Sequence, residues 1–258
     1  MPQDQEQEPE KVSETLGEIL PQLTPPSRKE NSMDTEPSLT CRFCGAHTFG
    51  AWDVCNDQKC QKKAFIQNIT ASPLSAIIGC GVPGRYQEAI LADFSPPIAA
   101  IRPNNQGLLI SGGPGVGKTH LAVAVFASAL ARCIVWSSAD AGPRVSAAFV
   151  NAPRFLAEIR GTFRRERGER ELDVIKRYTS QKLLILDDLG AEKSSEWTSE
   201  SLYVLLSARL DECVPTIVTS NLGLPELERV DPRLASRLGA MTYLVLRGVD
   251  RRLEMKED

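Results

Sequence analysis

Short apolar runs alternate with longer stretches of helical periodicity through the second half of the chain. The apolar runs predict buried strands at 108–110, 145–150, 182–186, 215–221 and 241–246. Helical spacing of the apolar residues predicts helices at 120–131, 151–163 and 199–211. A further short run at 133–136 fits a strand in an insertion. This alternation is typical of an α/β fold.

The first 40 residues follow neither pattern. They are rich in Gln, Glu, Pro and Ser and poor in aromatic residues, a composition that favours disorder. Within them, a helical pattern runs from Glu10 to Leu20 and ends at Pro21. An amphipathic helix on a disordered arm can dock in a groove of a partner protein. The alternative interpretation is a marginal helix without a role.

Charge is distributed unevenly along the chain. Nine acidic and three basic residues give residues 1–40 a formal net charge of −6, which leaves +3 on the other 218 residues of a chain whose total is −3. A mildly basic body with an acidic tail fits a protein that binds an anionic ligand locally. The N-terminus has no signal-peptide pattern, and Arg132 interrupts the best candidate for a membrane span. We therefore expect a cytoplasmic protein that does not enter a membrane.

One contiguous motif carries chemistry of its own. It satisfies the P-loop pattern G-x-x-x-x-G-K-[ST] with Gly112, Gly113, Pro114, Gly115, Val116, Gly117, Lys118 and Thr119. An expected strand precedes it and an expected helix follows it, which is the context that phosphate binding requires. The glycines let backbone N–H groups wrap the phosphates, and the helix N-terminus adds partial positive charge. We expect Lys118 to reach the β- and γ-phosphates of ATP and the Thr119 hydroxyl to bind Mg²⁺.

A second pattern lies at 182–188, where four large apolar residues precede Asp187 and Asp188. This is the Walker B pattern: a strand buried on both faces delivers carboxylates to its C-terminal end, where open α/β sheets bind ligands. We expect Asp187 to hold Mg²⁺ mainly through water, and Asp188 to orient and activate the attacking water. Asn221 ends the next strand, where its amide can reach the γ-phosphate or the water. The alternative for 182–188 is an ordinary buried strand ending in a polar turn.

Four cysteines upstream have the spacing of a metal site. Cys41 and Cys44 are separated by two residues, Cys55 and Cys60 by four, and ten residues lie between the pairs. Four sulfur ligands in a tetrahedral array suit a closed structural Zn²⁺ site. His47 is close enough in sequence to replace one thiolate. The alternative is four unpaired thiols. We expect Phe43, Phe49 and Trp52 to pack around the metal, and the module to bind a partner.

Between the cysteines and the P-loop, residues 69–106 contain many Gly and Pro residues and read as a connector. A segment in this position often covers the adenine base of a nucleotide. Tyr86 and Phe94 are the aromatic candidates for that contact, and both equally fit a core position.

The order of these motifs resembles the DnaC/IstB-like group of AAA+ ATPases over about residues 80–252. The likeness is carried by the P-loop, Asp187-Asp188, Thr219-Ser220-Asn221 and Arg233 to Arg237. The segments 85–94, 117–122 and 186–192 are similar to bacterial replicative helicase loaders, and the cysteine module resembles the DnaI-type arrangement. The resemblance implies a P-loop three-layer sandwich with five parallel strands and the P-loop strand in the centre.

The resemblance also implies roles for individual residues. Asn221 would be sensor 1, and His120 would lie among the nucleotide-binding residues with Tyr86. Arg237, or alternatively Arg233, would be an arginine finger that reaches a neighbouring subunit, which implies a homo-oligomer. Asp188 stands where most AAA+ proteins have Glu, which suggests slow turnover suited to a switch.

About 12 residues follow the last expected strand, so we expect no full helical lid domain. Sensor 2 is then uncertain, with Arg251 or Arg252 as the candidate. In the helicase loaders, the region that corresponds to 160–170 contributes to single-stranded DNA binding. Arginines pair with phosphates and Phe163 can stack on a base, so the contacts expected here are Arg160, Phe163, Arg164 and Arg165. Interleaved glutamates weaken this pattern, and the alternative interpretation is a solvated helix and loop.

These observations divide the chain into an acidic arm (1–40), a zinc module (41–68), a linker with the nucleotide-covering segment (69–106) and an ATPase domain (107–258). The favoured hypothesis is an ATPase that loads a replicative helicase hexamer onto single-stranded DNA, with ATP as the switch. A transposition helper ATPase of the IstB type and an adaptor that binds ATP without hydrolysing it are the alternatives. A small-metabolite kinase leaves Asn221 and Arg237 unexplained.

Overall fold

The computed structural model describes residues 40–48, 53–99, 101, 106–136, 142–163, 169–191 and 195–250. The expected helix at 10–20 lies outside these residues, as do Phe49, Trp52, Arg164, Arg165, Arg251 and Arg252. The chain divides into two compact units, residues 1–61 with 136–143, and residues 62–135 with 144–258. Within the described part, no helix combines the length and apolarity needed to cross a membrane.

The first unit holds the four cysteines in a short loop structure. Thr40 and His47 form an isolated antiparallel bridge, and a turn lies between them. The helix α1 (Gln58–Ala71) begins in this unit. The Asp57 carboxylate accepts hydrogen bonds from the backbone N–H groups of Lys59 and Cys60 at 2.9 and 3.2 Å, so it caps the free donors at the helix start. The cap therefore fixes the start of α1, whose first turn contains Cys60.

The second unit is built on a five-stranded sheet with the order β4-β5-β6-β1-β7. Its strands are β1 (Leu108–Gly112), β4 (Ala147–Asn151), β5 (Leu183–Leu189), β6 (Thr216–Ser220) and β7 (Thr242–Leu246). All four neighbouring pairs are parallel, which confirms the expected parallel sheet. The expectation that the P-loop strand is central is wrong. The central strand is β6, and β1 lies between β6 and β7 because the last strand adds at the far edge of β1.

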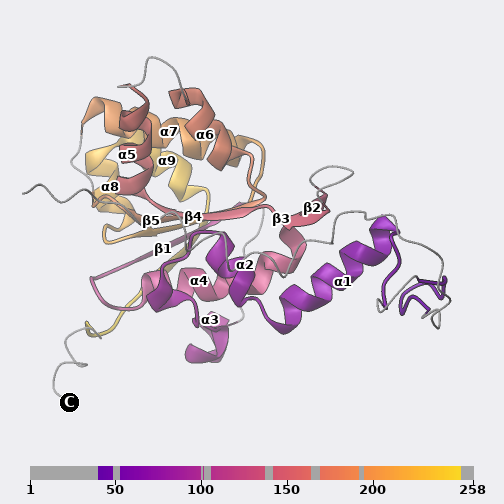
Figure 1. Ribbon diagram of the computed structural model, residues 1–258. Helices are drawn as coiled ribbons and strands as arrows, with labels where there is room; N and C mark the ends of the chain where they lie inside the picture. Colours follow the sequence, from indigo (N-terminus) through magenta and orange to yellow (C-terminus); the bar gives the residue numbers. More distant parts are fainter. Residues whose placement is uncertain are drawn as a thin grey trace, which may run out of the picture. The chain divides into compact units, whose positions relative to one another are not determined.

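Alternate residues of the inner strands enter two separate cores. Leu108 and Ile110 of β1 pack on one face with the P-loop helix α4 (Lys118–Ala129), whereas Leu109 packs on the other face. Figure 1 shows α2 and α4 on one side of the sheet and α5 to α9 on the other. Because both faces are covered, the strands carry almost continuous apolar runs. This burial explains why the runs are visible in the sequence.

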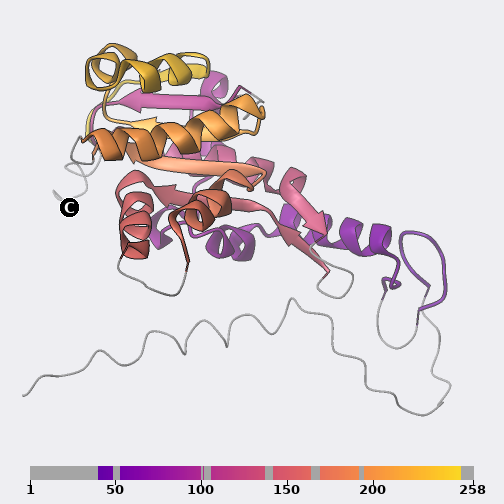
Figure 2. The same cartoon turned by 90° about the horizontal axis from the view of Figure 1, so that it is seen from above.

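Helices connect the strands in order. The face opposite α4 is covered by α5 (Ala152–Thr162), α6 (Glu171–Thr179), α7 (Glu196–Asp211), α8 (Leu224–Val230) and α9 (Pro232–Gly239). Figure 2 shows α7 running along the strands on the near side of the sheet. The segment before β1 contains α2 (Leu74–Gly79), the 3₁₀ turns η1 (Gly84–Tyr86) and η2 (Leu91–Asp93), and α3 (Pro96–Ala99).

The expected elements are present with shifted bounds. The strand expected at 145–150 is divided: β3 (Pro143–Val145) pairs with β2 (Ile134–Trp136) in a separate two-stranded sheet, and β4 starts at Ala147. The helix after the P-loop starts two residues early and ends in the 3₁₀ turn η3 (Leu130–Cys133). The helix expected from Ser199 starts at Glu196, because the Ser195 side chain accepts the Thr198 N–H and caps it. Asn151 caps α5 in the same way, as expected from the sequence.

Candidate functional site: a nucleotide cavity at the carboxyl edge of the sheet

The P-loop connects the end of β1 to the start of α4, and two of its glycines are required by close packing. A Cβ at Gly112 would lie 2.3 Å from the carbonyl oxygen of Leu246, at the end of the neighbouring strand β7. Gly115 has φ +69°, and a Cβ there would lie 1.6 Å from Oδ1 of Asp250. Side chains at these positions would displace the loop, because the first contact is with backbone and the second conformation strains L-residues. The glycines therefore let the loop close over the strand ends.

Lys118 is the first residue of α4 and is buried, with 7% of its surface exposed. Its ammonium group donates to the Gly113 carbonyl and to the Asn221 side-chain oxygen, both at 2.7 Å. These bonds hold the charge over the loop whose backbone would surround the phosphates. The expected P-loop lysine and the expected end-of-strand amide are therefore brought together.

Asp187 lies near the end of β5, beside the P-loop threonine. Its Oδ1 accepts hydrogen bonds from Oγ1 of Thr119 at 2.8 Å and from Oγ1 of Thr219 at 2.7 Å. Burial raises the pKa of Asp187, and the two hydroxyl donors oppose that rise. Hard oxygen donors held this close together suit Mg²⁺, which prefers carboxylate, hydroxyl and water ligands. Thr119 and Asp187 are the residues that fit the metal.

Asp188 follows directly and is linked to the sensor position. The Asn221 amide nitrogen donates to Oδ1 of Asp188 at 3.2 Å, while the Asn221 oxygen accepts from Lys118. The Asn221 amide therefore contacts both Lys118, which is expected to bind the γ-phosphate, and Asp188, which is expected to orient the water. This connection fixes the orientation of the amide, because only its oxygen can face the ammonium group.

These side chains surround a cavity of about 460 Å³. It is lined by Arg85, Tyr86, Pro114, Gly115, Gly117, Lys118, Thr119, His120, Asp187, Asp188 and Asn221. The expected P-loop, Walker B and sensor residues thus meet at one site, together with Tyr86 and His120. Gly112, Gly113 and Val116 belong to the loop but are not among the lining residues.

The segment before the P-loop forms one wall of this cavity. Tyr86 lines the cavity and also packs against the core beside α4, with the Arg85 guanidinium 4.6 Å from its ring centroid. Phe94 packs against the same core and contacts the His120 ring at 5.7 Å between centroids. Nε2 of His120 lies 2.7 Å from Oδ2 of Asp93. This pair ties the segment to the P-loop helix.

Neither candidate arginine finger lines the cavity of its own chain. Arg237 lies on α9, where its guanidinium donates to Asp211 at 2.6 Å and lies 5.9 Å from the Tyr203 ring centroid. Arg233, one helical turn earlier, lies 5.3 Å from the same ring. Both are therefore grouped on the α7–α9 surface.

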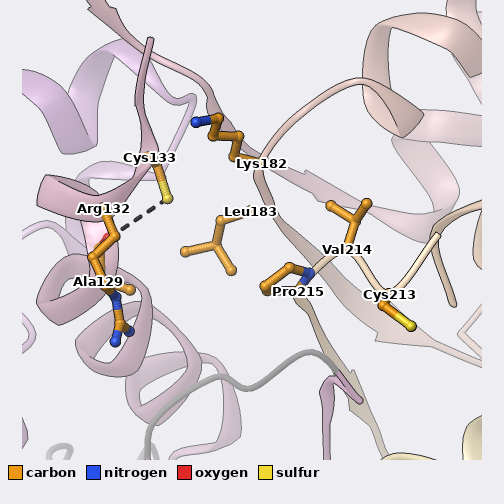
Figure 3. A pocket seen from close by; sticks show the side chains of 8 residues that line it. All are labelled: Ala129, Arg132, Cys133, Lys182, Leu183, Cys213, Val214 and Pro215. Atoms are coloured by element: carbon orange, nitrogen blue, oxygen red, sulfur yellow. Dashed lines mark hydrogen bonds between the residues drawn. The ribbon is translucent and has the colours of Figure 1, made fainter.

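A second cavity, of about 440 Å³, lies at the opposite edge of the sheet. Lys182 and Leu183 line it at the start of β5, and Pro215 lines it just before β6. Figure 3 shows the Lys182 amine and the Arg132 guanidinium pointing away from each other. These two cationic side chains therefore do not point to a common position, in contrast to the polar side chains of the first cavity.

Two of the expected DNA contacts fall within the described residues, and both adjoin an aromatic ring that sequence reasoning missed. The Arg160 guanidinium lies 4.8 Å from the Trp197 ring centroid, and the Phe163 ring meets Trp197 edge to face at 5.9 Å. Phe163 is 61% exposed. Arg160, Phe163 and Trp197 form one surface cluster, called here the aromatic patch. Trp197 is 34 residues from Phe163, so only packing brings them together.

The four cysteines of the first unit converge. The sulfur atoms of Cys41, Cys44, Cys55 and Cys60 all lie within 4.8 Å of one another, and the set does not include His47. The backbone N–H of Cys55 lowers the pKa of Cys41 to about 6, whereas burial raises the pKa of Cys60. Four soft sulfur ligands at this spacing fit Zn²⁺, and they leave no ligand position open for a reacting water.

Thr219 and Asp93 are site residues that the sequence did not single out. Thr219 stands in the Thr219-Ser220-Asn221 run at the end of β6, which was the available signal. Asp93 stands in the segment similar to helicase loaders, but nothing in its local sequence points to His120.

Comparisons with known proteins match this chain to an ATP-binding family and to proteins of DNA replication. A family model described as "IstB-like ATP binding protein" matches residues 98–239, more than half of the chain. The chromosomal replication initiator protein DnaA of Bordetella pertussis is 30% identical over 131 residues, which cover 50% of this chain and 25% of that protein. The chain therefore spans about a quarter of the length of this curated relative.

Two solved structures are similar to parts of this chain. A replication initiator DnaA bound to AMPPCP and single-stranded DNA is 17% identical with a TM-score of 0.50, covering 68% of this chain and 56% of that chain. A DnaC helicase loader is 23% identical with a TM-score of 0.49, covering 64% of this chain and all of that chain. The family match covers more than half of the chain, and the P-loop and Walker B residues converge within it: the chain belongs to the IstB-like ATP-binding proteins.

Proposed function

We propose that this chain is an ATPase that loads a replicative DNA helicase onto single-stranded DNA and uses the bound nucleotide as a switch. The observation that carries the ATPase part is the junction of Lys118, Asn221 and Asp188 beside the Thr119–Asp187 pair. The loader part is supported by the motif order, by the replication initiators among the relatives and by the cysteine cluster.

In the proposed reaction, a water oxygen bonds to the γ-phosphorus of ATP while the bond from that phosphorus to the bridging oxygen breaks. The products are ADP and phosphate. Asp188 orients the water and accepts its proton, and the Asn221 amide holds the water or a γ-phosphate oxygen. Lys118 balances the charge on the β- and γ-phosphates. Thr119 and Asp187 would hold Mg²⁺, which would neutralise part of the phosphate charge.

The position of Arg237 supports action between subunits. Because Arg237 and Arg233 lie away from the cavity of their own chain, a role in hydrolysis requires a second copy that brings α9 to the neighbouring nucleotide. The protein would then act as a homo-oligomer, with ATP at the subunit contact. Arg251, or alternatively Arg252, remains the proposed sensor 2 residue.

The aromatic patch supports a role in binding single-stranded DNA. Exposed Phe163 offers a face on which a base can stack, and Arg160 offers a cation for phosphate. Trp197 holds both residues in place from α7. We propose that Arg164 and Arg165, in the adjoining segment, extend this contact along the DNA backbone.

The cysteine cluster is proposed to bind Zn²⁺ and to dock the partner helicase, with the acidic arm as a further docking element. A closed sulfur site has a structural role, because metal binding supplies folding free energy to a short segment with little core of its own. Because these docking elements lie outside the ATPase domain, the nucleotide in the cavity could change while the partner stays bound.

A reconstitution with the replicative helicase of the same cell tests the loader proposal. With ATP and circular single-stranded DNA, the wild-type protein should increase the amount of helicase recovered on the circle, and Lys118→Ala should not. Lys182→Ala is the matched control, because this lysine lies at the opposite edge of the sheet. Equal recovery with and without the protein would overturn the loader proposal.

The family match favours a second function, a transposition helper that binds DNA and recruits a transposase. Co-sedimentation separates the two functions. A helper should sediment with duplex DNA in the presence of ATP and retain a transposase, whereas a loader should retain the helicase hexamer. If ATP binds in both assays and is never hydrolysed, the chain is the adaptor instead.

A further inference from the structure

The strand β5 is irregular where it carries its two acids. Leu186 pairs with Val218 of β6, and the next aligned pair is Leu189 with Ser220. Two residues of β5, Asp187 and Asp188, therefore face one residue of β6, Thr219. This is a β-bulge, which bends a strand locally and redirects a side chain.

The bulge explains how both acids reach the same cavity. In a regular strand, successive side chains point to opposite faces, so Asp187 and Asp188 would be separated by the sheet. Asp188 instead has φ 61°, in the left-handed region that residues other than glycine rarely adopt. Both acids line the nucleotide cavity as a result. A conformation of this kind persists only when its surroundings hold it.

Thr219 supplies that support with a single hydroxyl group. Its Oγ1 accepts the Asp188 backbone N–H at 2.9 Å and donates to Oδ1 of Asp187 at 2.7 Å. The side chain is fully buried, so water does not compete for either bond. One bond anchors the backbone of the bulge, and the other fixes the direction of the carboxylate.

We propose that Thr219 is the positioning residue of the nucleotide site: it holds Asp187 toward Mg²⁺ and Asp188 toward the attacking water. The role toward Asp188 and the attacking water rests on the proposed ATPase function, whereas the role toward Asp187 does not. Asn221, two residues later on the same strand end, contacts Lys118 and Asp188. The end of β6 therefore aligns both acids and the lysine as one element.

The same strand provides a matched control. Thr216 is also fully buried, and its hydroxyl accepts from Nε of Arg209 and donates to the Val214 carbonyl. It lies at the opposite end of β6 from the cavity. Thr216→Val and Thr219→Val make the same chemical change in the same strand, so a general loss of packing should affect both alike.

The first experiment measures Mg²⁺-dependent nucleotide binding, which needs no hydrolysis. A fluorescent ADP analogue is titrated into each protein in EDTA and across a range of MgCl₂ concentrations. Thr219→Val should bind the analogue normally in EDTA but need about 10- to 100-fold more Mg²⁺ for half of the metal-induced gain in affinity. Thr219→Ser, which keeps the hydroxyl, and Thr216→Val should both follow the wild type.

The second experiment measures steady-state ATP hydrolysis of the same proteins. The kcat of Thr219→Val should fall about 10- to 100-fold at saturating Mg²⁺ with little change in KM, and Thr219→Ser should recover most of it. If the wild type does not hydrolyse ATP, the ATPase proposal fails, while the Mg²⁺ titration still tests the role of Thr219 toward Asp187.

Three outcomes would overturn the inference. They are a folded Thr219→Val protein with the wild-type Mg²⁺ requirement, a Thr219→Ser protein as impaired as Thr219→Val, and a Thr216→Val protein with the same defect. Circular dichroism establishes folding for each variant. If Thr219→Val does not fold, Thr219→Ala removes the hydroxyl without adding a branched methyl group and takes its place in both experiments.

Discussion

The Lys118 ammonium group donates a hydrogen bond to the side-chain oxygen of Asn221, 103 residues away in sequence, at 2.7 Å. The same amide donates to Asp188 at 3.2 Å. The Asn221 amide therefore links Lys118, which is expected to contact the γ-phosphate, to Asp188, which is expected to orient the attacking water. When a nucleotide enters, the lysine can exchange this neutral acceptor for a phosphate oxygen, which is the stronger partner.

Replacing Asn221 tests the link between these two groups. Asn221→Ala should leave the affinity for a fluorescent ATP analogue nearly unchanged, because Lys118 and the loop remain. The kcat for ATP hydrolysis should fall about 100-fold, since the lost group acts mainly in the transition state. Asn221→Asp should be impaired at least as much, because its charge repels both Asp188 and the phosphate. A fall in affinity with normal kcat would contradict this role.

The candidate finger Arg237 is tested by mixing two inactive proteins. Arg237→Ala should bind ATP normally and lose roughly 1,000-fold in hydrolysis. Lys118→Ala should bind ATP poorly but still carry an intact Arg237. A mixture should hydrolyse ATP faster than either protein alone, because one subunit supplies the nucleotide site and the other the arginine. Arg233→Ala tests the alternative candidate on the same helix, and it should hydrolyse ATP normally if Arg237 is the finger. No recovery in the mixture would argue against action between subunits.

The metal content of the cysteine cluster is directly measurable. Elemental analysis of the purified protein should find Zn²⁺ at one per chain, and a strong chelator should remove it with loss of the fold of residues 41–60. Cys44→Ser should reduce the zinc content, because a hydroxyl is a poor ligand for this site. Cys213→Ser is the control: Cys213 is free, exposed and outside the cluster. Zinc-free protein with an intact module would refute the metal site.

The contacts of Arg209 allow a prediction about the stability of the fold alone. It is fully buried, and its guanidinium donates to the Thr216 hydroxyl and to four backbone carbonyls, those of Tyr178, Thr179, Gln181 and Pro215. Among the described residues no carboxylate lies within ion-pair distance of it. Burial lowers the pKa of Arg209 to about 10, so it stays charged at neutral pH.

Arg209→Met should lower the free energy of unfolding by about 3 kcal/mol, because several buried carbonyls lose their donor at once. Urea denaturation followed by circular dichroism measures the change. Arg154→Ala is the control. The Arg154 side chain is 70% exposed, so its ion pair with Glu158 should contribute less than about 0.5 kcal/mol to the free energy of unfolding. Equal stability of Arg209→Met and the wild type would show that the carbonyls find other donors.

The family match and the converging site agree with what local sequence could predict. The apolar runs at 108–110 and 183–186 are recognisable because burial on both faces of the sheet favours apolar residues at every position. The P-loop is recognisable because its phosphate contacts come from consecutive residues. The cysteine set is recognisable because ligand spacing follows from the reach of a tight turn.

The tertiary structure decided the features that depend on pairing between distant residues. Nothing in the sequence places β6 at the centre of the sheet, since strand order depends on which edges pair. The bulge that turns Asp188 toward Asp187 exists only against Thr219, and the patch under Phe163 exists only because α7 brings Trp197 beside it. The sequence therefore determined which residues are available to the cavity. Packing determined the direction of their side chains, because that direction depends on contacts with residues distant in sequence.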